Sequence, residues 1–325
     1  MTKKNLLAIF ILMILALAWA VSGIIITRKN EPQINNGRLV FARTASHRNI
    51  SKITVTSSEG SISFEADNNM WLVKESDYYY ANIELLNLLM SDIHTARYIG
   101  KQTFNKTLME KLSLLMPAAN ETGAGTLIET FDEQGNPLDA IIIGKQNKKN
   151  NFYFVRPADK EEIWIADGNF LLPAEVYSWL MQPLFEFPEN IFETISVTDG
   201  ETTSTAARNN ARAHFFNKEN VVFPKAVIER YSYLIAEKVL SAQNFDETLF
   251  PRHKQIVLST FNGLKITTDM FYDNKEYWIK ITLSPMVLST VAVNDYIKDN
   301  AFRFDGWYFK IPQAAGKVFA NFNMM

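Results

Sequence analysis

Cysteine is absent from the 325 residues of this chain. Its absence excludes disulfide bonds, thiolate metal sites, cysteine nucleophiles and acylation at a lipoprotein cysteine. A body without disulfides must be stabilised by a hydrophobic core, and a chain of this length can bury one. We therefore expect a folded protein whose stability comes from packing.

Recognisable catalytic motifs are missing as well. The sequence has no G-x-S-x-G elbow, no S-x-x-K pair, no P-loop and no H-E-x-x-H motif. Histidine is scarce, and the four histidines are far apart in sequence: His47, His94, His214 and His253. No spacing between them is typical of a metal site. We therefore assign no catalytic, cofactor-binding or metal-binding residue.

The acidic residues offer only a weak alternative. Asp132-Glu133 and Glu161-Glu162 are acidic pairs, and carboxylates can work as acid and base. A glycan hydrolase would need two carboxylates held about 5 to 9 Å apart in a cleft. Both pairs fall in expected hairpin turns, where solvated turn residues are the more common finding. A carboxylate-dependent hydrolase therefore remains an alternative.

An excess of positive charge is also lacking. Beyond residue 30 the chain has 29 basic and 35 acidic residues, which gives this part a formal charge of −6. Nucleic acids and anionic lipids require a basic face. We therefore expect no nucleic acid partner. The 41 aromatic residues favour a body rich in β-strands.

One long segment, Leu6–Ile26, has no charged residue and follows Lys3 and Lys4. As a helix it measures about 31 Å, close to the hydrocarbon thickness of a bilayer. Its thirteen Leu, Ile, Phe and Val residues favour insertion by about 4 to 8 kcal/mol. We expect residues 1–27 to form a cytoplasmic tip and a single transmembrane anchor, because a long downstream domain translocates largely regardless of charge.

A cleaved signal peptide is the alternative for this segment. Ala18-Trp19-Ala20 has the small-x-small form that signal peptidase recognises. The apolar run continues to Ile26, and a signal peptide needs no such continuation. Both interpretations place the body outside the cytoplasm.

The next segment and the first half of the body follow a readable order. Residues 28–49, with Pro32 and Asn35-Asn36-Gly37, are expected to form a tether. Alternation of apolar and polar residues from Ile50 to Val73 then predicts a three-stranded meander. Asn82 is placed to cap a helix that Gly100 ends. Four further strands are expected: Thr126–Phe131, Leu138–Ile143, Phe152–Arg156 and Glu162–Ala166.

The same order appears a second time. Ile195-Ser-Val-Thr echoes Ile53-Thr-Val-Thr, and Pro224 opens a second helix whose apolar stripe runs to Val239. Asn262-Gly263 between two β runs is a strong hairpin signal. We predict an α+β fold with two similar modules of β-meander, helix and β-meander, mainly antiparallel, at 50–190 and 191–325.

Tyr78, Tyr79 and Tyr80 precede the first helix. Consecutive aromatics in an extended segment cannot all face one core, so we expect at least one of them to be exposed. Exposed tyrosine is favoured in recognition surfaces and can stack on sugar rings or on a protein. These residues are our candidate contact for a partner or a glycan, and covering a sheet edge is the alternative.

The layout resembles a bacterial family known as a numbered domain of unknown function, the DUF4340 type. The resemblance is carried by the anchor, by Asn69-Met-Trp-Leu-Val73, by Leu138-Asp-Ala-Ile-Ile-Ile-Gly144 and by Phe152-Tyr-Phe-Val-Arg156. It covers most of residues 5–285. Members are often encoded beside gliding-motility-type ABC transporter components, so the resemblance implies an envelope protein that assists such a complex. It brings no catalytic residue.

These observations together predict a non-catalytic, single-pass protein of the bacterial inner membrane, anchored through residues 6–26, with its bulk in the periplasm. We expect it to be an accessory or binding component of an ABC-type transport complex or another envelope complex, with a permease or other envelope protein as partner. The alternative is an envelope glycan-binding protein or the hydrolase named above.

Overall fold

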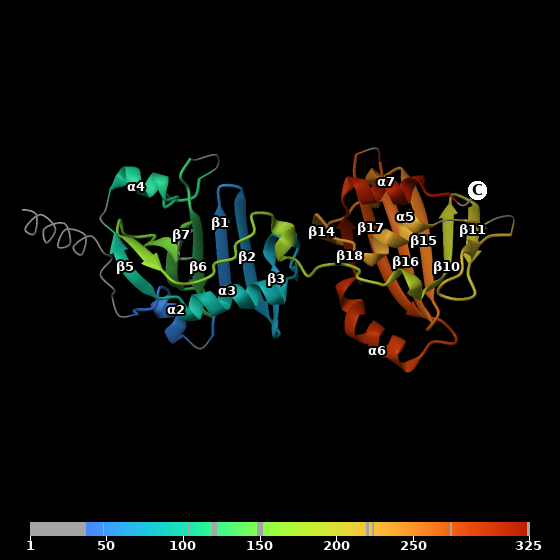
Figure 1. Ribbon diagram of the computed structural model, residues 1–325, viewed down its shortest axis with the longest axis horizontal. Helices are drawn as coiled ribbons and strands as arrows, with labels where there is room; N and C mark the ends of the chain where they lie inside the picture. The colour runs from blue at the N-terminus through green and yellow to red at the C-terminus, as the bar shows by residue number, and fades with distance from the viewer. Residues whose placement is uncertain are drawn as a thin grey trace, which may run out of the picture.

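Two β-sheets of nine strands each form the body of the protein (Figure 1). The computed structural model describes residues 37–323, except residues 48, 103–104, 119–121, 148–151, 219–220, 223 and 274. The segment 6–26 that we expect to be the anchor lies outside the described residues. Within the described residues, no helix has the length and apolar character needed to cross a membrane.

The first sheet is antiparallel throughout and has the strand order β4-β3-β2-β1-β6-β7-β8-β9-β5. Its strands are β1 (Lys52–Ser57), β2 (Gly60–Asp67), β3 (Met70–Val73), β4 (Tyr79–Tyr80), β5 (Tyr98–Gln102), β6 (Thr126–Phe131), β7 (Pro137–Asn147), β8 (Phe152–Pro157) and β9 (Ile163–Ala166). We call this sheet with its helices the first module.

The second sheet is also antiparallel and has the order β13-β12-β11-β10-β15-β16-β17-β18-β14. Its strands are β10 (Phe192–Asp199), β11 (Thr202–Ala207), β12 (Phe215–Phe216), β13 (Val221–Val222), β14 (Lys238–Ser241), β15 (Arg252–Thr260), β16 (Leu264–Tyr272), β17 (Tyr277–Pro285) and β18 (Trp307–Lys310). This sheet and its helices form the second module.

The two sheets have the same topology. Numbered within its own module, each sheet has the strand order 4-3-2-1-6-7-8-9-5. A helix lies between the fourth and fifth strands of each module: α3 (Ile83–Thr95) in the first and α5 (Lys225–Ser232) in the second. The predicted α+β class with two similar, mainly antiparallel modules is therefore confirmed.

Helix α3 follows from local sequence. The side chain of Asn82 accepts a hydrogen bond from the backbone N–H of Leu85 at 3.2 Å and caps the first turn, as predicted. Leu86, Leu89 and Ile93 are buried on one face. The helix ends at Thr95 and not at Gly100, because Ala96 and Tyr98 form backbone hydrogen bonds with residues 38–40.

Helix α5 is shorter than the sequence suggests. It ends at Ser232, although apolar residues continue at helical spacing to Val239. The backbone of Leu234 pairs with Phe185 in the segment that links the modules, and Val239 pairs with Phe309 in the sheet. Tertiary hydrogen bonds here override an apolar period that fits a helix.

The described part of the expected tether belongs to the first module. Val40 and Phe41 are buried in its core, and the short helix α2 (Ala42–Ser46) follows. The backbone N–H of Thr44 donates to Asp139 at 2.8 Å. From Gly37 onward, the segment that we expect to be a tether is therefore packed against the first module.

The remaining helices cover the sheets: α4 (Lys106–Lys111) in the first module, and α6 (Val291–Asn300) and α7 (Gln313–Asn321) in the second. Short 3-10 helices complete the fold: η1 (Lys74–Ser76), η2 (Val176–Trp179), η3 (Glu189–Ile191), η4 (Glu247–Leu249) and η5 (Ala301–Arg303). One hydrophobic cluster, from Val40 to Phe319, contains buried residues of both modules. The modules are therefore packed against each other.

Candidate functional site at the joint between the modules

The two modules meet at unlike edges of their sheets. Strand β4 and helix η1 of the first module contact β14 of the second. The three tyrosines singled out from the sequence lie in this joint or beside it. The joint therefore brings the predicted contact residues together with residues of the second module.

Tyr79 lies at the centre of the joint and is fully buried. Its ring packs edge-on against Trp307 at 5.1 Å and Phe309 at 5.6 Å between ring centroids. Its hydroxyl donates to the backbone oxygen of Arg303 at 3.2 Å. Burial raises the pKa of Tyr79, so the phenol stays protonated and remains a donor.

Tyr80 lies at the rim of the joint and is half-buried. Its ring stands perpendicular to Phe302 of the second module, with 4.8 Å between centroids. Its backbone oxygen accepts a hydrogen bond from the N–H of Met181 at 2.8 Å. Tyr79 and Tyr80 thus serve contacts within the molecule.

Tyr78 is the exposed member of the three. Its side chain is 44% exposed, which confirms that at least one of the tyrosines faces solvent. Asp77 and Tyr78 both have left-handed backbone, with φ of 55° and 63°. Two successive residues in this region are costly for side chains with a Cβ, and such strain is concentrated at functional sites. This local conformation separates the ring of Tyr78 from the buried ring of Tyr79.

The carboxylate of Asp77 crosses the joint. Its Oδ2 accepts hydrogen bonds from the backbone N–H of Ser241 at 2.9 Å, the hydroxyl of Ser241 at 3.2 Å and Nδ2 of Asn244 at 2.8 Å. Partial burial raises the pKa of Asp77, but these hydrogen bonds and nearby Lys238 outweigh burial, so the pKa lies below its ordinary value of 3.8.

Acid is expected to weaken the joint through Asp77. The pKa of Asp77 is lower in the folded protein than its ordinary value of 3.8, which we take for the unfolded chain. The ionised carboxylate therefore stabilises the fold above pH 3.8, and this stabilisation is lost as the pH falls through the pKa of the folded state. We therefore expect wild type to melt at a higher temperature than Asp77→Asn above about pH 5. The difference should shrink below pH 3.8. Calorimetry of both proteins over this pH range measures the difference in melting temperature. A difference that does not change with pH contradicts a stabilising role for the Asp77 carboxylate.

A groove runs along the surface of the joint. Its volume is about 460 Å³, within the range of small-molecule sites. Residues of both modules line it: Lys74, Asp77, Tyr78, Gln243, Asn244 and Gly306. We call it the joint groove.

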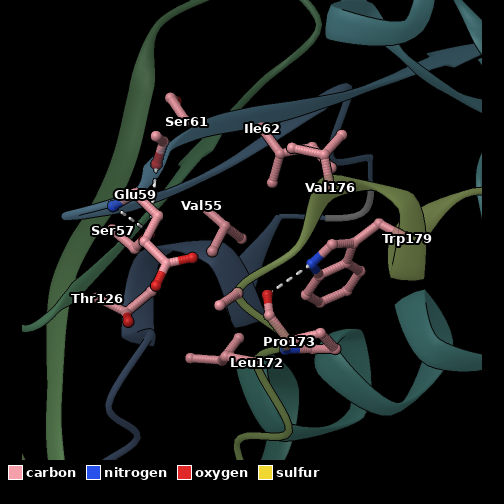
Figure 2. Close-up of a pocket in the computed structure, with 12 residues that line it drawn as sticks. Val55, Ser57, Glu59, Ser61, Ile62, Thr126, Leu172, Pro173, Val176 and Trp179 are labelled. Atoms are coloured by element: carbon pink, nitrogen blue, oxygen red, sulfur yellow. Dashed lines mark hydrogen bonds between the residues drawn. The ribbon is translucent and has the colours of Figure 1, made fainter. Parts of the chain in front are cut away.

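A second cavity, of about 90 Å³, lies within the first module between the β1–β2 hairpin and residues 172–179 (Figure 2). Val55, Ile62 and Trp179 form much of its wall. The indole N–H of Trp179 donates to the backbone oxygen of Pro173 at 3.1 Å. This space is below the size of typical ligand pockets. We therefore treat it as part of the packing around Trp179.

The predicted acidic pairs are surface residues in turns. Asp132 accepts hydrogen bonds from the backbone of Gln134 and Asn136 and closes its own turn. Glu162 forms an ion pair with Lys101 at 2.8 Å. Neither contact brings two carboxylates together.

The histidines are likewise dispersed. His47 and His94 contact backbone oxygens in their own helical turns, and His253 lies 3.5 Å from Asp269. Over the described part of the chain, no group of three His, Asp or Glu residues is placed to hold a metal.

Sequence reasoning missed the second-module half of the joint. Arg303, Trp307 and Phe309 follow a helix that has no equivalent in the first module, and Asn244 lies in a turn. No motif or period marks these residues as a contact surface. Only the duplication, which places an edge strand at β14, points to this region.

Comparison with known proteins gives one result. Residues 71–266, more than half of the chain, match the family model described as Domain of unknown function (DUF4340). No curated protein and no solved structure matches the chain. The matched residues run from β3 to β16 and include Asp77, all three joint tyrosines and Asn244. The chain therefore belongs to the DUF4340 family.

Proposed function

We propose that the protein is a membrane-anchored binding component of an ABC-type transport complex or another envelope complex. Residues 6–26 anchor it in the bacterial inner membrane, and the two modules lie in the periplasm. The uninterrupted apolar segment and the membership of the DUF4340 family support this proposal. The described chain begins beside β5, at the end of the first module away from the joint (Figure 1).

An exposed apolar surface on the second module carries the proposal. We call it the apolar tip, and its residues are Phe261, Met286, Val287, Leu288 and Val291. Val287 is completely exposed, Leu288 is 90% exposed and Val291 is 76% exposed. Monomeric proteins rarely present such side chains next to one another unless another molecule covers them.

The apolar tip is held in place by the β15–β16 hairpin. The N–H of Met286 donates to the backbone oxygen of Gly263 at 2.8 Å, and the N–H of Thr290 donates to that of Asn262 at 3.1 Å. A Cβ at Gly263, where φ is +91°, would lie 2.5 Å from the Cα of Ser289. The glycine thus allows the loop to pack closely on the hairpin, and the exposed side chains are displayed from a fixed backbone.

The partner that fits this surface is an apolar protein surface. Residues 284–291 include no charged residue, so ion pairing does not direct the contact. Covering one fully exposed Leu or Val contributes about 2 kcal/mol. Three such side chains can therefore supply much of the affinity of an interface. A permease or another envelope subunit of the complex is the partner we propose.

The test is affinity capture of the full-length protein from detergent extracts. Wild type is expected to recover ATPase and permease subunits of one transport complex. A variant carrying Val287→Asp and Leu288→Asp should lose them, since burying two unpaired carboxylates opposes binding. A reporter at the C-terminus that is active only outside the cytoplasm checks the location in the same cells.

Leu249→Asp is the matched control, because Leu249 is 69% exposed and belongs to η4, away from the apolar tip. This variant should recover the same subunits as wild type. Recovery of the protein alone, under conditions that keep other complexes whole, would refute the proposal. If the double variant recovers the same subunits as wild type, the apolar tip is not the surface that contacts the partner.

A further inference from the structure

We propose that the joint groove binds a short oligosaccharide, with the ring of Tyr78 as the surface on which a sugar ring stacks. The proposal does not depend on the partner function proposed above, because it concerns a different surface. Lys74 and Tyr78 come from the first module, and Gln243, Asn244 and Gly306 come from the second. The site exists only while the two modules are joined.

Tyr78 supplies an apolar face to the groove. Its ring is 44% exposed, although the tyrosine that follows it is completely buried. Its left-handed φ of 63° and that of Asp77 fix the direction of the backbone at this point. The ring is therefore presented to solvent at the groove, where a ligand can stack on it.

Most of the other residues that line the groove have polar side chains. Asp77 positions the amide of Asn244 through the 2.8 Å hydrogen bond, and the exposed side chains of Gln243 and Lys74 add donors and acceptors nearby. Planar amides and an ammonium group can each pair with hydroxyls or with the N-acetyl groups of amino sugars. Gly306 has no side chain that would fill the space.

This combination favours a saccharide over other ligands. A pyranose ring has an apolar C–H face, which stacks on an aromatic ring, and a rim of hydroxyls, which need polar partners. A peptide ligand would need apolar pockets for its side chains, and among the residues that line the groove only Tyr78 and Ala242 have apolar side chains of their own. Nucleic acid is disfavoured by the charge of −6 beyond residue 30.

The proposal is tested with two probes, the tetrasaccharide of N-acetylglucosamine and cellotetraose. Binding to the full chain in detergent is measured by calorimetry and by ligand-observed NMR. At least one probe is expected to bind saturably. Tyr78→Asn should weaken that binding about tenfold or more. Asparagine tolerates left-handed backbone, so this substitution removes the ring and keeps the turn.

Three further variants distinguish a loss of ligand contacts in the groove from a general loss of folding. Tyr78→Phe keeps the ring and should bind as wild type does. Tyr233→Asn is the matched control, because Tyr233 is 62% exposed but lies outside the groove. Gln243→Ala changes an exposed residue that the second module contributes to the groove, and it should also weaken binding.

Two results would overturn the proposal. One is the absence of binding by either probe at about 10 mM, which is weaker than the usual range for specific sites. The other is equal binding by wild type, Tyr78→Asn and Gln243→Ala, which would place the sugar elsewhere on the molecule.

Discussion

Tyr79→Ala is expected to lower the free energy of unfolding by about 3 to 5 kcal/mol, the usual cost of removing a buried aromatic side chain. The substitution removes a fully buried ring from the contacts with Trp307 and Phe309, and it leaves the backbone oxygen of Arg303 without its donor. Because these contacts join the modules, wild type should unfold in one transition and the variant in two. Chemical denaturation followed by fluorescence and by circular dichroism measures both effects.

Tyr79→Phe separates the ring from the hydroxyl. It keeps the edge-on packing and loses one hydrogen bond, so we expect a cost of about 1 kcal/mol and a single transition. Tyr233→Ala, at an exposed position, should change stability by less than about 0.5 kcal/mol. If Tyr79→Ala leaves one transition with wild-type stability, the joint is not what holds the modules together.

Lys254→Met is expected to have the second-largest effect, about 3 kcal/mol. Lys254 is fully buried in β15, and its ammonium donates to the backbone oxygens of Ala320 and Phe322 at 2.7 and 3.1 Å. Methionine fills the same space but has no hydrogen-bond donor. The backbone oxygens of Ala320 and Phe322, at the end of α7, therefore lose their hydrogen bonds. Hydrogen exchange should show the greatest loss of protection in α7.

The ion pair of Lys254 is the smaller part of this effect. Its ammonium lies 3.1 Å from Asp199, whose side chain is 54% exposed, so water weakens the attraction. Asp199→Asn should therefore cost less than about 1 kcal/mol. Lys265→Met, at an exposed position in the neighbouring strand, is the control and should be close to neutral. A large loss in Asp199→Asn with a small loss in Lys254→Met would reverse this assignment.

Much of the fold could be predicted from sequence because its signals are local. The expected strand Thr126–Phe131 has the bounds of β6 in the structure, and the expected meander up to Val73 forms β1, β2 and β3. The Asn262-Gly263 turn joins β15 and β16 as expected, and Asn82 caps α3. The order of these elements also revealed the duplication, although few residues are shared between the copies.

The rest depends on contacts between distant parts of the chain. The Tyr79 hydroxyl and the Arg303 oxygen are separated by 224 residues, and no periodicity relates them. The end of α5 is set by pairing of Leu234 with Phe185, which a helical apolar pattern conceals. For the same reason the sequence marked three tyrosines as one surface, whereas the structure places Tyr79 inside the joint and Tyr78 outside it.

Joining through unlike edges has a consequence for how many copies can associate. The edge β4 meets the edge β14, so one edge of each kind, β13 and β5, is left at the outer ends of the pair. Repeats that meet in this way can add further units without limit and grow into fibres. At the outer edge of the second module, β13 carries Val221 and Val222 where β4 carries Tyr79 and Tyr80. The aromatic contact that joins the two modules is therefore not repeated at this outer edge.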